Sequence, residues 1–360
     1  MKSVTLRDVA AAAGVSVSTA SRVLDDRLPV SRTATAGRVR EAAERLGYRK
    51  DAAASALRRG DTGTVGVLVP RLSDTVMALL FEALSRQAAD RGLFALVSVC
   101  GDEAADERRA IDALLARRVD GLVLAAARLG GEVPVGLRAS GVPHVLAVRT
   151  DGLSPSAVCD DELGGYLATR HLLDLGHRRI AILPGPDFTS TAMQRLAGYR
   201  RALAEAGVAT GGEEASGLVR HSLFSTHAGR EAAAALLADR PGITAVFAAN
   251  DQLALGTLAA AQDAGRRVPE DLSVVGYNDT PLAAELRTPL TSVRVPFERI
   301  ASDALDLLTA QIQGRAAVVP SEAAGAAGQA GTTGALTPVP PVTRVSEPTL
   351  IPRRSTAPLR

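Results

Sequence analysis

The stretch TLRDVAAAAGVSVSTASRVL, residues 5–24, decides the fold of the N-terminal part of the chain. Its apolar residues recur at the spacing of one helix face, namely Leu6, Val9, Ala10 and Ala13. Thr5 with Asp8 three residues later is typical of a helix start, and Gly14 can adopt the left-handed conformation that ends a helix. Ser16 can cap a second helix directly afterwards. The stretch therefore predicts a helix, a tight turn and a second helix.

The outer face of the second predicted helix is small and polar. The residues expected on this face are Val17, Ser18, Ser21 and Arg22. Such a face fits the major groove of DNA, because Arg22 can bond a phosphate or a guanine while its neighbours are small. A plain helical hairpin without DNA contacts is the alternative.

A third helix is predicted next, with Ser31 as its cap and Gly47 at its end. Its apolar residues at helical spacing are Val39, Ala42, Ala43 and Leu46. Residues 1–60 hold twelve Lys or Arg against six Asp or Glu, a net charge of +6, whereas the other 29 Lys or Arg and 33 Asp or Glu give −4. Three small helices with this charge predict a DNA-binding head over residues 1–49.

Residues 50–61 are expected to connect this head to the body as a short hinge helix or linker. The stretch DAAASALRRG carries one large apolar side chain, Leu57, followed by Arg58 and Arg59. A helix this short is marginal alone, so we expect it to order on DNA, with Leu57 as a minor-groove wedge between phosphate-binding arginines. A solvated Ala-rich linker is the alternative.

From residue 62 onwards apolar runs alternate with amphipathic segments, which is typical of βαβ units and parallel sheets. The expected strands are 65–69, 93–99, 121–125, 144–148, 180–183, 245–248 and 273–276. Residues 62–360 are too long for one comfortable sheet, so two doubly wound lobes are predicted, with a ligand cleft between them. Residues 316–342 are rich in Ala, Gly, Thr and Pro and are interpreted as a disordered insertion.

Several classes of protein are disfavoured by composition. The two cysteines, Cys100 and Cys159, form neither a disulfide framework nor a paired metal motif, which suits a reducing cytoplasm. No secretory leader or run of about 20 apolar residues is present, so no membrane contact is expected. The only lysines, Lys2 and Lys50, lie outside any phosphate-binding loop. No cofactor and no metal site are expected.

The residues resemble the LacI/GalR family of bacterial transcriptional repressors. In the head, TLRDVAAAAGVSVSTASRVL and RLGYRKDAAASALRRG are similar to that family, and the resemblance implies base or phosphate contacts for Val17, Ser18 and Arg22. The matching body motifs are VDGLVLAA, GHRRIAILPGP, RLAGYRRAL, FAANDQLALG and SVVGYNDTPLAAELRTPLTSVR. The full set of candidate DNA contacts is Thr5, Ser16, Val17, Ser18, Thr19, Ser21, Arg22, Leu57, Arg58 and Arg59.

The resemblance also implies an α/β fold with a helix-turn-helix head and a two-lobed, periplasmic-binding-protein-like core that binds an effector. The candidate effector residues are Asp74, Arg149, Asp160, Thr191, Arg195, Phe224, Asn250, Asp251 and Asn278. Four of them have a structural alternative: Phe224 as core, Asp160 and Asp251 as helix caps, and Arg195 in a surface salt bridge.

This chain departs from the family pattern in places. Lys50-Asp51 replaces a Pro-Asn before the hinge, Ser55 replaces a hinge Arg or Gln, and the 31–39 stretch is one residue longer. In the core, Ser73 to Met77 lacks the two usual aromatics, and Asn278 and Val148 each replace an Asp. These changes weaken stacking on a sugar and the carboxylate grip on its hydroxyls, so the ligand is expected to be either unusual or absent.

The leading hypothesis is a cytoplasmic, homodimeric repressor whose affinity for operator DNA is set by a small, sugar-like effector. Induction and corepression both remain open, as do the operator and the effector. A rival is an α/β enzyme acting on sugars or nucleosides, with Asp160, Asp161 and Glu162 as a metal or acid/base cluster. A third hypothesis is a binding protein whose head no longer recognises DNA.

Overall fold

The computed structural model describes residues 4–24, 30–48, 61–101, 103–213, 217–314 and 342–359. The predicted hinge residues Leu57, Arg58 and Arg59 lie outside the described residues, as does the predicted insertion apart from Val342.

The head consists of three helices packed around small apolar side chains. They are α1 (Leu6–Ala13), α2 (Val17–Val23) and α3 (Ala34–Leu46). Val9, Ala20 and Val39, one from each helix, are fully buried in a common cluster. Because each helix buries only a narrow stripe, the outer surface of α2 stays available.

The predicted helix ends of the head are largely confirmed. The Thr5 side chain accepts a hydrogen bond from Asp8 N while Asp8 Oδ2 accepts one from Thr5 N (2.8 Å), and Gly14 adopts φ 66°. Ser16 Oγ accepts from Thr19 N (3.1 Å) and so begins α2. The expected cap of α3 was wrong: it is Thr33, whose Oγ1 accepts from Ala36 N (3.3 Å), because Ser31 lies three residues before the first helical turn.

Two sheets follow the head, and each organises one lobe. The first lobe contains a six-stranded sheet in the order β10-β5-β4-β3-β1-β2, and the second lobe a five-stranded sheet in the order β11-β9-β8-β7-β6. The strands of the first are β1 (Thr64–Val69), β2 (Phe94–Val99), β3 (Gly121–Leu124), β4 (His144–Ala147), β5 (Ser156–Cys159) and β10 (Thr343–Ser346). Those of the second are β6 (Ile180–Leu183), β7 (Ala245–Ala248), β8 (Ser273–Asn278), β9 (Thr291–Arg294) and β11 (Thr349–Ile351). All pairings are parallel except that of β11 with β9, so the predicted doubly wound α/β class is confirmed.

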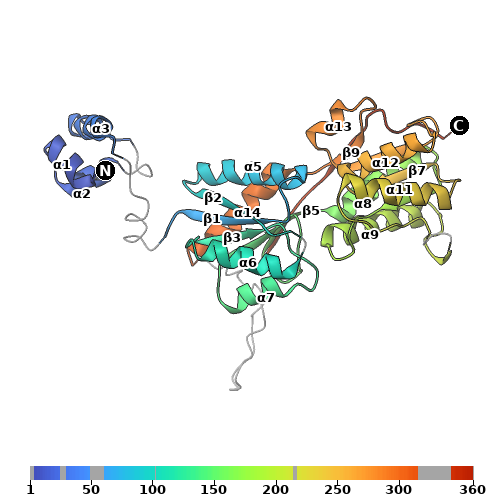
Figure 1. Cartoon of the computed structure of the whole chain (residues 1–360), viewed down its shortest axis with the longest axis horizontal. Coiled ribbons are helices and arrows are strands. Elements are labelled where there is room, and N and C mark those ends of the chain that lie inside the picture. The colour runs from blue at the N-terminus through green and yellow to red at the C-terminus, as the bar shows by residue number, and fades with distance from the viewer. Residues whose placement is uncertain are drawn as a thin grey trace, which may run out of the picture.

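Helices cover both faces of each sheet (Figure 1). In the first lobe they are α5 (Thr75–Asp90), α6 (Ala104–Leu115), α7 (Glu132–Ala139) and α14 (Phe297–Ile312). In the second they are α8 (Asp161–Asp174), α9 (Ser190–Glu205), α11 (Thr226–Asp239), α12 (Asp251–Asp263) and α13 (Pro281–Glu285). Among these described helices, none is both long and apolar enough to span a membrane.

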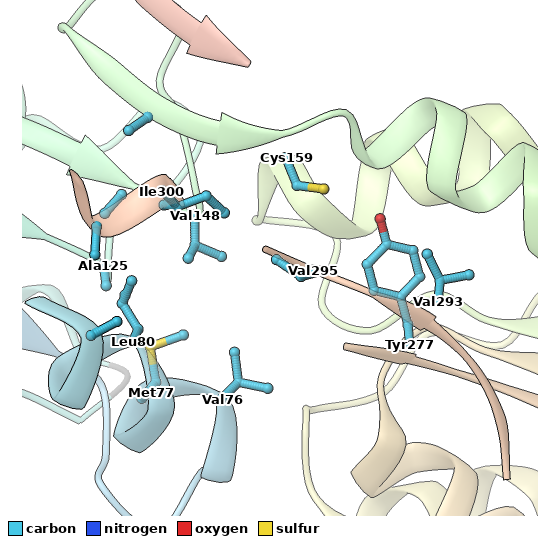
Figure 2. Packing of buried hydrophobic residues seen from close by; sticks show 14 of the residues in the cluster. Val76, Met77, Leu80, Ala125, Val148, Cys159, Tyr277, Val293, Val295 and Ile300 are labelled. Carbon is cyan, nitrogen blue, oxygen red and sulfur yellow. The ribbon is translucent and has the colours of Figure 1, made fainter. Parts of the chain in front are cut away.

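The lobes are joined along a shared seam. The chain passes between them from β5 to α8, from β9 to α14 and from β10 to β11. Figure 2 shows Val76, Met77 and Val148 of the first lobe facing Tyr277 and Val293 of the second, and these residues belong to one apolar cluster. Two hydrogen bonds also cross the seam, from Leu129 N to Phe188 O and from Thr150 N to Ser190 Oγ (both 2.9 Å).

Helices α8 and α9 approach each other unusually closely, and glycines make this possible. A Cβ added at Gly198 would lie 1.9 Å from Glu162 O, and one at Gly165 would lie 2.2 Å from Arg195 O. The obstructing atoms are backbone atoms, which cannot move aside cheaply. This contact fixes Arg195 on α9 directly against the start of α8.

Candidate functional site

The face of α2 predicted to meet DNA is open in the head. Val17 is 40% exposed although it is apolar, and Ser18 and Arg22 are also exposed. The hydroxyl of Ser16 lies 2.9 Å from that of Ser18 and 2.8 Å from that of Thr19. Thr5, Ser16 and Thr19 therefore shape the helix starts, and Val17, Ser18, Ser21 and Arg22 form the surface that a partner can touch.

Seven of the nine predicted effector residues line one cavity between the lobes, here called the inter-lobe cavity, of about 20 Å³. Its lining is Asp74, Val76, Met77, Val148 and Arg149 from the first lobe and Thr191, Arg195, Phe224, Asn250 and Asn278 from the second. Asp74, Arg149, Thr191, Asn250 and Asn278 follow or end strands β1, β4, β6, β7 and β8. Ligands of parallel sheets bind at these carboxyl ends.

The first lobe contributes two opposite charges. Asp74 begins α5, where its Oδ1 accepts a hydrogen bond from Val76 N (3.0 Å), and burial raises the pKa of its carboxyl group. Arg149 is 8% exposed and donates to Ala126 O (3.5 Å). A carboxyl and a guanidinium group that line the same cavity can together accept hydrogen bonds from ligand hydroxyls and donate hydrogen bonds to them.

The backbone is strained where Arg149 enters the cavity. Val148 has φ 67°, and Arg149 N donates to Ala147 O (2.7 Å), which closes a three-residue γ-turn around Val148. A β-branched residue with positive φ is rare and costs about 1 to 3 kcal/mol. Asn278 also has positive φ, 97°, at the end of β8. Residues with strained backbone conformations are common at functional sites. Here Val148 lines the inter-lobe cavity from the first lobe and Asn278 lines it from the second.

Arg195 is buried, not part of the surface salt bridge given as its alternative. It is 4% exposed; its Nε donates to Asp161 Oδ1 (2.8 Å), Nη2 pairs with the same oxygen (2.7 Å), and Nη1 donates to Ala249 O (2.5 Å). Its guanidinium also stacks 3.7 Å from the ring centre of Tyr277. Although burial works against the charge, Asp161 raises the pKa of Arg195. Arg195 therefore holds the loop before Asn250 in place as well as lining the cavity.

Asn250 and Phe224 line the inter-lobe cavity and also stabilise the fold. Asn250 Oδ1 accepts from Leu253 N (2.7 Å) and caps α12. The Phe224 ring packs on Gly185, where an added Cβ would lie 2.2 Å from the ring. Phe224 is 9% exposed, so it is part of the core and of the cavity wall at once.

Asp160 and Asp251 lie outside the cavity lining. Asp160 Oδ1 accepts from Leu163 N (2.8 Å) and caps α8. Asp251 accepts from Thr280 N (2.7 Å), Thr280 Oγ1 (2.9 Å) and Ser292 Oγ (2.7 Å), and burial raises its pKa to about 6. Asp160 is a helix cap, as its structural alternative stated. The alternative for Asp251 was wrong, because Asn250 caps α12 and the carboxylate of Asp251 binds Thr280 and Ser292 instead.

The acidic trio at the start of α8 does not converge on a common point. Asp160 caps the helix, Asp161 binds Arg195, and Glu162 pairs with Arg201 (2.6 Å). Within the described part of the chain, no group of three or more His, Cys, Asp or Glu is placed to hold a metal ion. The geometry gives the rival enzyme hypothesis no catalytic cluster.

Three lining residues, Val76, Met77 and Val148, were noted in the sequence only as departures from the family pattern and not as candidate effector residues, and the partner of Arg195 was missed. Val76 and Met77 follow β1 at the position of the missing family aromatics, which was the available signal. Asp161 gave no such signal, because it is 34 residues from Arg195 and was grouped with its acidic neighbours.

Two parts of this chain match known protein families. Residues 169–328 match the periplasmic binding protein-like domain, and residues 5–51 match the bacterial regulatory proteins of the lacI family. The transcriptional regulator CelR of Thermobifida fusca is 36% identical over 319 residues, 86% of this chain and 92% of the relative. The chain belongs to the lacI family of bacterial regulatory proteins, which are helix-turn-helix transcriptional regulators and not enzymes.

Two solved structures agree over nearly the whole chain. A CelR–cellobiose complex has a TM-score of 0.69 at 30% identity and covers 98% of this chain and 99% of its own. A lac repressor dimer bound to operator and an anti-inducer has a TM-score of 0.79 at 28% identity, covering 99% and 100%.

Proposed function

We propose that the protein acts in the cytoplasm as a homodimeric repressor whose affinity for operator DNA is set by a sugar-like effector bound in the inter-lobe cavity. The observation that carries this proposal is the cavity itself, because its polar side chains come from the strand ends of both lobes. A ligand held by both lobes is sensitive to their arrangement. It can shift operator affinity by as much as its affinities for the two arrangements differ.

The size of the cavity supports a switch rather than a permanently open binding site. A volume of about 20 Å³ has room for one or two water molecules, whereas a sugar ring needs several times as much. Binding must therefore move the lobes or the lining side chains. The seam hydrogen bonds of Leu129 and Thr150 are the contacts that such a movement strains.

The DNA side of the proposal follows from the head and from the relatives. The open face of α2, with Arg22 in the last turn of the helix, is the proposed recognition surface, and Leu57, Arg58 and Arg59 are proposed as minor-groove contacts. The lac repressor similar to this chain binds operator as a dimer, and CelR was solved with cellobiose. Two identical heads related by a two-fold axis match a palindromic site.

Footprinting on the DNA upstream of the protein's own gene tests this side of the proposal. We expect symmetric protection of two half-sites about one helical turn apart, or a close variant of that spacing. We also expect log affinity to fall with log salt at roughly 0.9 per phosphate contacted. Protection of one non-symmetric half-site by a monomer, or an affinity indifferent to salt, would contradict the proposal.

A further inference from the structure

A cation–π contact crosses the seam between the two lobes. The guanidinium carbon of Arg128 lies 3.6 Å from the ring centre of Phe188. Arg128 follows β3 in the first lobe and Phe188 follows β6 in the second, so neither residue lies on a segment where the chain passes from one lobe to the other. The Arg128–Phe188 contact therefore depends on how the lobes are placed relative to each other.

Phe188 is fixed to the helix that brings two candidate effector residues to the inter-lobe cavity. The next residue, Thr189, donates to Pro186 O from its N (3.2 Å) and from its Oγ1 (2.9 Å), which closes a turn around Phe188 directly before α9. Helix α9 carries Thr191 and Arg195, which line the cavity. A movement of this helix relative to the first lobe therefore moves the Phe188 ring relative to Arg128.

Arg128 also shares a counter-charge with a candidate effector residue. Arg128, Arg149 and Glu107 line one small cavity, with Phe188 in its wall. Glu107 is 5% exposed; burial raises the pKa of its carboxyl group, and the charges of Arg128 and Arg149 act in the opposite direction. The same carboxylate therefore stabilises both cations. Because Arg149 also lines the inter-lobe cavity, the seam contact and the candidate effector site are electrostatically linked.

Two backbone amides close to this contact in the chain can report whether the seam is closed. Leu129 N donates to Phe188 O, and Thr150 N donates to Ser190 Oγ (both 2.9 Å). Both hydrogen bonds are broken when the lobes separate at this edge, so exchange of these amide hydrogens with solvent measures the opening. Thr150 is the cleaner reporter, because its neighbours in the chain stay unchanged in variants of Arg128 and Phe188.

We propose that Arg128 is a positioning residue of the switch: stacked on Phe188, it stabilises the lobe arrangement described here and so sets how strongly the protein favours that arrangement before any effector binds. This inference rests on the proposed function, in which the arrangement of the lobes controls operator affinity. Neither residue lines the inter-lobe cavity, so both act on the balance between arrangements and not on the ligand. Both side chains are half-buried, and a cation–π contact of this kind shifts such a balance by about three- to tenfold.

Hydrogen exchange of the full chain, measured without any sugar, tests the contact itself. Arg128→Met, which removes the charge, and Phe188→Leu, which removes the ring, should each raise the exchange rate at Thr150 by about three- to tenfold. The double variant should raise it no further, because both substitutions remove the same contact. Arg128→Lys keeps a cation and should retain most of the protection. Arg201→Met is the matched control, since it removes a cation–π contact with Tyr166 (4.5 Å) inside the second lobe, and it should leave Thr150 unchanged.

Operator affinity separates a role in the switch from a purely structural one. On the operator identified by footprinting, without sugar, Arg128→Met and Phe188→Leu should change the Kd in the same direction and by about three- to tenfold. Arg128→Lys and Arg201→Met should stay near the wild type. Unchanged exchange at Thr150, additive effects in the double variant, or an unchanged Kd despite faster exchange overturns the inference and leaves the proposed function standing. Failure of the wild type to bind any operator overturns the proposed function and this inference with it.

Discussion

Replacing Arg195 with alanine is expected to lower the free energy of unfolding by about 3 to 5 kcal/mol, because it leaves Asp161 as an unpaired buried charge. Both side chains are almost wholly buried, at 4% and 1% exposure, so solvent does little to screen the lost interaction. The substitution also removes the donor to Ala249 O and the group stacked on Tyr277. Urea unfolding of the variant and the wild type measures the difference.

Two comparisons sharpen this test. Arg201→Ala breaks the exposed pair with Glu162 at the same helix contact, where both side chains are more than 40% exposed, and should cost less than about 1 kcal/mol. Combining Arg195→Met with Asp161→Leu removes both charges and should recover part of the stability. An Arg195→Ala protein as stable as the Arg201→Ala protein would refute the buried pair.

The same variant bears on the effector response. At a temperature where Arg195→Ala remains folded, we expect it to bind operator normally, because the head is a separate helical cluster. Its response to ligand should be lost, since Arg195 no longer holds the carbonyl group of Ala249, next to Asn250, in place. Arg195 is thus expected to act as a positioning residue in addition to any direct contact with the ligand.

Replacing Arg22 with alanine is expected to weaken operator binding by about 1 to 3 kcal/mol per half-site, and so by about 2 to 6 kcal/mol in a symmetric dimer. Arg22 is the basic residue of the last turn of α2 and is exposed on its outer face. The planar fork of donors in Arg22 can bond two acceptors of one guanine in a fixed geometry, whereas the ammonium group of a lysine is a flexible point charge without that geometry. Arg22→Lys should therefore recover non-specific affinity but not specificity. Gel-shift titrations on operator and on random DNA measure both.

Arg45→Ala is the matched control for Arg22, since it removes the same charge from an exposed position in α3. It should weaken operator and random DNA equally, because a charge that only attracts phosphates does not discriminate between sequences. If Arg22→Ala and Arg45→Ala lose affinity to the same extent on both DNAs, then α2 is not the recognition helix.

The parts of this fold that depend on local chemistry could be predicted from the sequence. Thr5, Gly14 and Ser16 act through hydrogen bonds and backbone conformation within a few residues, and the structure confirms them as helix boundaries. Strands β6 and β7 were predicted to the residue, because their apolar runs are buried on both faces.

Short polar strands were missed for the opposite reason. β5 and β9 each have four residues and carry buried serine or threonine, so neither forms an apolar run. Their hydroxyl groups form hydrogen bonds with residues far away in the sequence. For example, Ser292 Oγ donates to Asp251 Oδ1 (2.7 Å). The last two strands, β10 and β11, are also short, and they belong to different sheets.

The candidate site also has some residues that the sequence indicates and others that only the packed structure shows. The resemblance to the LacI/GalR family implied Asp74, Arg149, Thr191, Asn250 and Asn278 as effector residues. They line one cavity because parallel sheets bring the residues at their strand ends to one edge. The pairing of Arg195 with Asp161 arises only when helices α8 and α9 pack together. A pattern of residue types cannot show which of several neighbouring carboxylates turns inward.

The most direct test of the account is the operator Kd of the wild-type protein, measured by fluorescence anisotropy with and without a saturating sugar that raises its Tm. If the inter-lobe cavity controls the head, the Kd changes by about five- to 150-fold, and operator DNA changes the sugar affinity by the same factor. The direction of the change distinguishes induction from corepression. A sugar that binds the cavity and leaves the operator Kd unchanged would contradict the account.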